Sequence, residues 1–210
     1  MNFFSIKPLE LFVFFIILPI SFLWSYPLPL KIAFALIGLM YIIIKLKKAN
    51  ALHFNKRILY QNPDFWKRLG IQFVLLILIT TTYVYLKAPD KLFSVPLKKP
   101  GLWVLILAIY TFLSVWPQEI IYRTFFFLRF ENLFKNKWLF VLTNGLLFSL
   151  AHIFFRNILV LMLTFIGGLL FAYTYFTTRS TILTSIEHAI YGNWLFTVGM
   201  GEMLAFPGAD

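Results

Sequence analysis

Long apolar runs separated by short polar stretches dominate the pattern along the chain. Seven runs have the roughly 17–25 residues that a helix needs to cross a bilayer. They cover approximately residues 9–25, 29–46, 69–87, 101–117, 138–155, 157–177 and 181–200. The pattern therefore predicts an all-α fold, a polytopic membrane helix bundle with about seven transmembrane helices.

Two features of the runs bear on how the bundle is built. Residues 117–134 continue the helical pattern of the fourth run but contain Glu119 and Arg123, so this segment is predicted to dip into the interface or to continue the fourth helix with a bend. In the sixth run, Gly167 and Gly168 form a small-residue pair, which predicts close packing against a neighbouring helix.

Composition agrees with a membrane protein. Hydrophobic residues make up 60% of the 210 residues and charged residues 13%, against about 25% charged in a typical soluble domain. The mean hydropathy is +0.82. The chain has no cysteine, which excludes disulfides, thiolate nucleophiles and cysteine-based zinc sites.

The net charge of +11 is explained by membrane topology rather than by nucleic-acid binding. A basic stretch from Lys45 to Arg68 joins the second and third runs and is predicted to be a cytoplasmic loop against anionic headgroups. With the N-terminus in the cytoplasm, about two thirds of the 19 Lys and Arg residues lie inside, which favours this orientation.

Three ionisable side chains inside apolar stretches are the main candidates for chemistry. Glu119, His152 and His188 fall in three separate helical segments of the C-terminal half. A charged side chain at the bilayer centre costs roughly 2.5–3.5 kcal/mol on insertion scales, so it persists mainly where it faces protein or a water cavity. Each has a structural alternative: Glu119 and Arg123 as an i,i+4 ion pair, the histidines as interhelical packing contacts.

Taken together, these side chains indicate a buried polar site assembled from several helices. A carboxylate, two imidazoles and an amide supply a general base, water-orienting groups and an oxyanion donor, which fits hydrolysis of a peptide bond by activated water. The amide is Asn193, five residues after His188, and it faces the same side only if the helix is distorted, for example by a π-bulge near Gly192.

The order of the motifs resembles a known family, the CPBP intramembrane proteases, which include the CAAX proteases, the Abi proteins and bacteriocin-processing proteins. QExxxR at residues 118–123, FxxxH at 148–152 and a late His188 with a following Asn193 resemble its EExxxR, FxxxH and HxxxN/D motifs. The run HAIYGN resembles a short bacterial subgroup. Two positions depart from the family pattern: Gln118 replaces the first glutamate, and Asn193 comes one residue late, with Gly192 at the expected position.

The resemblance implies an intramembrane endopeptidase of glutamic or metal-dependent type, a hydrolase for which removal of a C-terminal tail is one implied form of cleavage. Its catalytic helix bundle would span residues 101–210, after N-terminal transmembrane helices and a basic loop in residues 1–100, all within one integral membrane domain. The expected site residues are Glu119 as general base, Gln118 and Arg123 as positioning groups, His152 and His188 as water-orienting groups and Asn193 as oxyanion donor.

No cofactor is expected, although zinc bound by Glu119, His152 and His188 is the metal-dependent alternative. Because Arg123 competes for the carboxylate, we expect no essential metal. The expected partners are the lipid bilayer and a membrane-anchored protein or peptide substrate, in a bacterial inner (plasma) membrane, with no nucleic acid. Two other functions remain open: a catalytically inactive relative acting in bacteriocin immunity or peptide binding, which Gln118 favours, and a small proton-coupled transporter.

Overall fold

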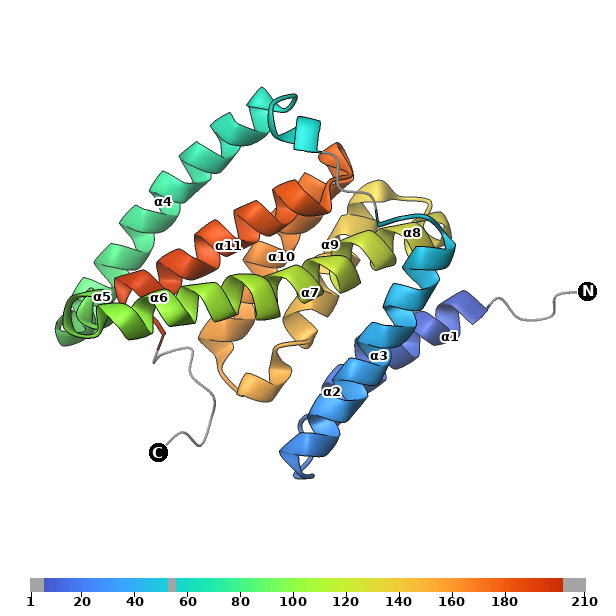
Figure 1. The fold of residues 1–210 in the computed structure, drawn as a ribbon, viewed down its shortest axis with the longest axis horizontal. Helices are drawn as coiled ribbons and strands as arrows, with labels where there is room; N and C mark the ends of the chain where they lie inside the picture. Colours follow the sequence, from blue (N-terminus) through green and yellow to red (C-terminus); the bar gives the residue numbers. More distant parts are fainter. Residues whose placement is uncertain (1–5, 53–55, 202–210) are drawn as a thin grey trace, which may run out of the picture.

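A computed structural model describes residues 6–52 and 56–201, which contain helices and no strand (Figure 1). This confirms the predicted all-α membrane fold. Among the short elements, η1, η4 and η5 are π-helical, and η2, η3, η6 and η7 are 3-10 helices. The elements are α1 Ile6–Phe12, η1 Val13–Ile17, α2 Leu18–Ser21, α3 Leu28–Lys48, η2 Lys56–Leu59, α4 Pro63–Lys87, η3 Pro89–Lys91, α5 Ser94–Lys98, α6 Pro100–Ile109, η4 Tyr110–Val115, α7 Trp116–Glu119, η5 Ile120–Phe125, α8 Phe126–Phe130, η6 Glu131–Leu133, α9 Lys137–Leu150, η7 Ile153–Phe155, α10 Ile158–Thr178 and α11 Thr181–Val198.

Five helical segments of the described residues are long and apolar enough to cross a membrane, so the predicted number of seven is not confirmed. The first predicted run is helical only over residues 6–21, about 24 Å at 1.5 Å per residue, which is short of the roughly 30 Å hydrocarbon core. The last run forms α11, whose 18 residues include Glu187 and His188. The five segments are Leu28–Lys48, Pro63–Lys87, Pro100–Leu133, Lys137–Phe155 and Ile158–Thr178.

The charged segment after the fourth run continues that run as one helical rod of 34 residues, Pro100–Leu133 (Figure 1, green). The rod contains two π-helical turns, η4 and η5, on either side of the short α7. Pro117 lies two residues after the end of the first of these turns; proline has no backbone N–H donor, and such a loss is commonly accommodated by irregular turns. Helix α11 packs along this rod and contacts α6, η4, α7 and η5.

Helices α9 and α10 approach closely, as the glycine pair in the sixth run predicts. A Cβ added at Gly168 would lie 3.1 Å from the Cα and the carbonyl oxygen of Gly145. Bare backbone surfaces at both positions let the two helices touch without side chains between them. This contact fixes α9, which carries the FxxxH motif, against α10.

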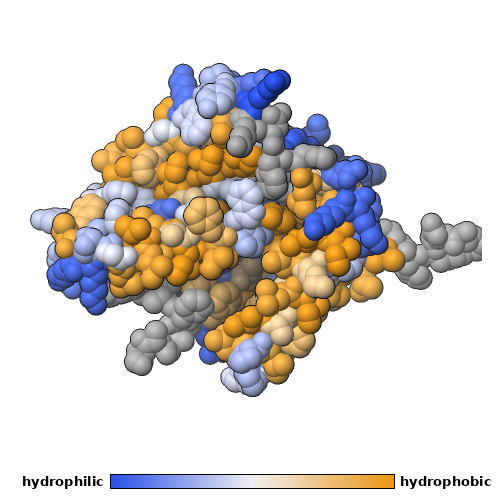
Figure 2. All heavy atoms as spheres, viewed as in Figure 1, coloured by the Kyte–Doolittle hydropathy of each residue, from blue (hydrophilic) through white to orange (hydrophobic). Residues whose placement is uncertain are grey.

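The surface agrees with a protein that sits in a bilayer. In Figure 2, apolar side chains cover a broad middle zone of the visible face, and hydrophilic side chains gather at its margins. Many large apolar residues are exposed, among them Leu36, Ile79 and Leu113 at 58%, 67% and 74%. Such an apolar outer surface is the arrangement that lipid tails solvate.

Candidate active site

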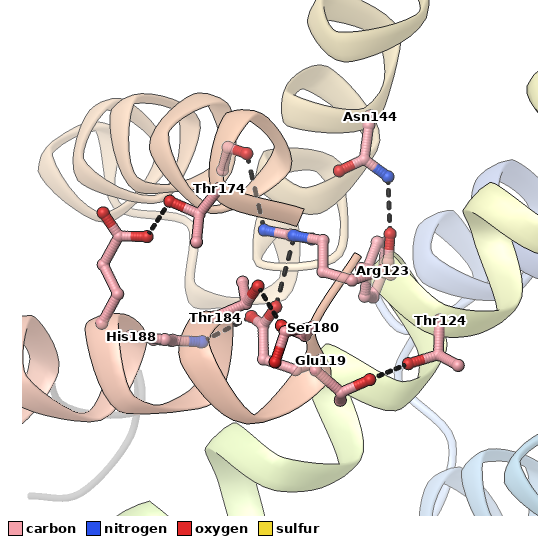
Figure 3. Close-up of polar contacts among 12 residues, drawn as sticks. Glu119, Arg123, Thr124, Asn144, Thr174, Ser180, Thr184 and His188 are labelled. Atoms are coloured by element: carbon pink, nitrogen blue, oxygen red, sulfur yellow. Dashed lines mark hydrogen bonds and ion pairs between the residues drawn. The ribbon is translucent and has the colours of Figure 1, made fainter. Parts of the chain in front are cut away.

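The polar centre of the bundle is a chain of three buried side chains (Figure 3). Glu119 and Arg123 are fully buried, and His188 is 6% exposed. His188 Nδ1 lies 2.8 Å from Glu119 Oε1, and Arg123 Nε lies 3.3 Å from Glu119 Oε2. An ionised carboxylate only accepts hydrogen bonds, so His188 donates from Nδ1 and its Nε2 faces away from the carboxylate.

Local sequence accounts for this placement. Glu119 and Arg123 are one turn apart on the rod and therefore share a face, while His188 reaches them from α11, which packs along the rod. The Glu119–Arg123 ion pair lacks hydrogen-bond geometry, and Glu119 Oε2 accepts no hydrogen bond from the described residues. One carboxylate oxygen is therefore held by an imidazole, and the other keeps its capacity to accept a proton.

Arg123 is held by aromatic rings as well as by the carboxylate. Its guanidinium carbon lies 4.6 Å from the Phe148 ring centroid and 5.7 Å from that of Phe171. Its terminal nitrogen Nη2 donates to the Gly168 carbonyl at 3.5 Å. Cation–π contacts of this kind gain strength where water is excluded, so the rings help the interior accept the charge.

The same two phenylalanines hold His188. Its ring stacks on Phe171 with centroids 4.4 Å apart and meets Phe148 edge-on at 5.6 Å. With Arg123 against the same rings, the imidazole and the guanidinium share one aromatic wall. This wall fixes the orientation of both groups toward Glu119.

His152 lies in the turn that follows α9, beside the same wall. Its ring centroid is 4.9 Å from that of Phe148, four residues earlier, and Nδ1 is 2.8 Å from the Phe148 carbonyl oxygen. A carbonyl only accepts, so His152 donates from Nδ1, and Nε2 is left as an acceptor. Phe148 thus contacts both histidines, and no direct bond joins His152 to Glu119 among the described hydrogen bonds.

The two amides predicted for the site have other partners. Gln118 donates its amide to Ser114 Oγ at 2.8 Å, on its own helix, and its carbonyl Oε1 has no partner among the described residues. Asn193 donates to Thr111 Oγ1 at 3.0 Å, on η4. Helix α11 is α-helical throughout Thr181–Val198, so the π-bulge considered for it does not occur, and Asn193 faces the rod instead.

A second buried carboxylate, Glu187, was not among the predicted site residues. It is fully buried, and Oε2 accepts from Thr174 at 2.5 Å while Oε1 accepts from Tyr191 at 3.4 Å. Arg68 of α4 donates to the same Thr174 hydroxyl, so the network joins α4, α10 and α11. The signal available in the sequence was a carboxylate next to a histidine within an apolar run, but its partners come from distant segments.

The arrangement does not favour a three-ligand metal site. Among the residues that the structure describes, no group of three His, Cys, Asp or Glu side chains is placed to hold a metal ion. Glu119 is bound to His188 and paired with Arg123. The zinc set of Glu119, His152 and His188 is not found as such a group among the described residues, and the role of a metal stays a prediction.

Comparison with known proteins bears on the same region. The model of the type II CAAX prenyl endopeptidase Rce1-like family matches residues 100–194. Over these residues the chain is similar to the Rce1-like family. The match covers Glu119, Arg123, His152 and His188, and it is consistent with the CPBP resemblance. The chain matches no curated protein and no solved structure at a significant level. With its apolar helices the chain is an integral membrane protein, and residues 100–194 are similar to a protease family.

Proposed function

We propose that this protein is an intramembrane endopeptidase that hydrolyses a peptide bond in a membrane-associated protein or peptide. The observation that carries the proposal is the fully buried Glu119 carboxylate, 2.8 Å from His188 Nδ1 and 3.3 Å from Arg123 Nε. The Rce1-like family match supports peptide-bond chemistry in a membrane. The name of that family also supports removal of a C-terminal tail as the form of cleavage.

In this mechanism Glu119 is the general base. Its Oε1 is occupied by His188, so we assign Oε2 as the atom that takes a proton from the attacking water. Arg123 orients the carboxylate through the ion pair between Nε and Oε2, 3.3 Å apart. Gln118 cannot act as a base because an amide does not take up a proton at neutral pH, and we assign it to positioning.

The histidines complete the proposed mechanism. His188 holds the carboxylate through Nδ1, and His152, in contact with the same Phe148 ring, presents Nε2 as an acceptor that can orient water. After water adds to the scissile carbonyl, protonated Glu119 returns its proton to the leaving nitrogen. The peptide bond then breaks, and the carboxylate is regenerated.

The test compares the membrane-anchored peptides of cells that carry wild type, Glu119→Ala or His152→Ala, by mass spectrometry of C-terminal fragments. We expect the same uncleaved precursors to accumulate in both variants. Glu131→Ala is the matched control, because Glu131 forms a partly exposed ion pair with Arg179 outside the site. Identical fragment profiles, with all proteins present at equal levels in the membrane, would contradict the proposal.

A second candidate is a catalytically inert protein that binds peptides, for instance in bacteriocin immunity. Gln118 is the residue that favours it, since its half-buried side chain replaces the carboxylate of the family pattern. The variant Gln118→Glu separates the two. A gain of hydrolysis over an inactive wild type would support a decayed site, whereas loss of a wild-type activity would show that the glutamine is part of an active one.

We also propose that no metal is essential for the reaction. The supporting observation is that both oxygens of Glu119 face protein cations or donors, His188 and Arg123. We expect cleavage by the purified protein to continue at an unchanged rate after dialysis against EDTA or 1,10-phenanthroline. A loss that is restored by adding zinc would overturn this part of the proposal.

A further inference from the structure

The hydroxyl of Tyr110 lies directly on the backbone of α11, one turn beyond His188. A Cβ added at Gly192 would be 2.1 Å from the Tyr110 hydroxyl oxygen and 2.3 Å from its ring carbons. No side chain larger than that of glycine fits at position 192 while Tyr110 keeps this position. The phenol therefore fills the volume that a side chain of α11 would otherwise occupy on this face.

The position of Tyr110 relates it to the Glu119–His188 pair. Its ring meets the His188 ring edge-on, with centroids 5.9 Å apart, and packs against Phe196 at 5.1 Å. Tyr110 is the first residue of the π-helical turn η4, in which the wider winding changes the direction of the side chains that follow α6.

The Tyr110 hydroxyl and the nearby Asn193 amide differ in whether they already have a hydrogen-bond partner. The Asn193 amide donates a hydrogen bond to Thr111 Oγ1 at 3.0 Å. No hydrogen bond to another described residue holds the Tyr110 hydroxyl. A tyrosine hydroxyl stays protonated at neutral pH and can donate a hydrogen bond.

We propose that Tyr110 is a catalytic residue that donates a hydrogen bond to the oxyanion of the tetrahedral intermediate. The inference rests on the proposed endopeptidase function. The oxygen of water bonds to the carbonyl carbon, and one water proton passes to Glu119. The carbonyl π-electrons move onto the carbonyl oxygen, which becomes negatively charged. The Tyr110 hydroxyl donates a hydrogen bond to this oxyanion and keeps its proton. Collapse re-forms the carbonyl and breaks the C–N bond, and the nitrogen takes the proton from Glu119.

The experiment uses the full-length protein in detergent and a synthetic copy of a peptide whose uncleaved form accumulates in Glu119→Ala cells. Tyr110→Phe removes only the hydroxyl and keeps the ring contacts with His188 and Phe196. Loss of one oxyanion donor typically costs about 10²–10³-fold in kcat, so we expect a fall of that size with KM within about threefold of wild type. Tyr83→Phe, a 37% exposed tyrosine on α4, is the matched control and should cleave at the wild-type rate.

A second pair of variants exploits the close approach to Gly192. We expect Tyr110→Ala to be as slow as Tyr110→Phe, and Tyr110→Ala/Gly192→Asn to regain at least about tenfold in kcat, because an amide donor then occupies the vacated volume. If Tyr110→Phe unfolds in detergent, a regained rate in the folded double variant supports the assignment and its absence overturns it.

The outcomes separate this inference from the function on which it rests. Cleavage that depends on Glu119 but continues at the wild-type rate in Tyr110→Phe overturns the Tyr110 assignment alone. If no peptide accumulates in Glu119→Ala cells, the endopeptidase proposal and the Tyr110 assignment fall together.

Discussion

At the scale of single residues, the centre of this protein depends on charges that are buried together. Glu119 and Arg123 are both fully buried, and the aromatic wall of Phe148 and Phe171 receives the guanidinium. Breaking one partner of a buried ion pair is costly because the other charge is left uncompensated, about 3–5 kcal/mol. Each of the two buried charges therefore depends on the other for its stability at this site.

Arg123→Lys tests whether the shape of the cation matters beyond its charge. A lysine ammonium keeps the charge but cannot lie flat between two rings. We expect thermal unfolding in detergent to show a loss of about 1–2 kcal/mol, and the cleavage rate to fall about 10²-fold because Glu119 is no longer held in register.

Arg179→Lys is the control for this substitution. Arg179 is 48% exposed and pairs with Glu131 at the surface, where such ion pairs contribute about 0–1 kcal/mol. Equal losses of stability and activity in Arg123→Lys and Arg179→Lys would show that the aromatic wall has no special role.

The sequence allowed part of this site to be predicted, and the reason is local geometry. Glu119 and Arg123 are one helical turn apart, and Phe148 and His152 are also four residues apart, so their proximity follows from helix periodicity. The contact between Glu119 and His188 joins residues 69 positions apart, and only the packing of α11 along the rod determines it. Glu187 accepts from Tyr191, four residues later on its own helix, but its other partner, Thr174, comes from α10, which no local pattern specifies.

At the scale of elements, irregular and small features position the chemistry. Two π-helical turns flank Glu119 in the Pro100–Leu133 rod, and the first of them begins at Tyr110. Hydrophobic periodicity predicted the helices but not these turns, because a single π-helical turn shifts the pattern by less than one residue per turn. The seven apolar runs likewise did not show that residues 6–21 are too short to count as a span.

The glycine contact between α9 and α10 predicts which glycine-to-alanine substitution lowers the stability of the protein and which does not. In Gly168→Ala the new methyl group would lie 3.1 Å from Gly145 and would push the helices apart, which we expect to cost about 1–3 kcal/mol in detergent unfolding. In Gly70→Ala, within α4, the methyl group meets nothing within 4 Å, so the variant should be neutral or more stable by up to about 1 kcal/mol. Destabilisation of the same size in both variants would contradict the packing argument.

At the scale of the whole molecule, the orientation in the membrane is a prediction that the absence of cysteine makes easy to test. Lys47 is exposed at the end of α3, before α4, and Lys98 is exposed at the end of α5, after α4. With the basic stretch from Lys45 to Arg68 in the cytoplasm, a membrane-impermeant maleimide applied to intact cells should label Lys98→Cys and spare Lys47→Cys, because the span Pro63–Lys87 separates the two positions. Permeabilised cells should label both, and the reverse pattern in intact cells would mean that the whole chain is inverted.

The length of the Pro100–Leu133 rod has a consequence for where in the bilayer a substrate would be cut. At about 1.5 Å per residue, Glu119 lies roughly 28 Å along the rod from Pro100, and a hydrocarbon core is about 30 Å thick. If the rod enters at one headgroup layer near Pro100, its carboxylate therefore stands close to the opposite layer rather than at the midplane. At that depth water is already plentiful, and the bonds within reach are those where a substrate chain emerges from the lipid.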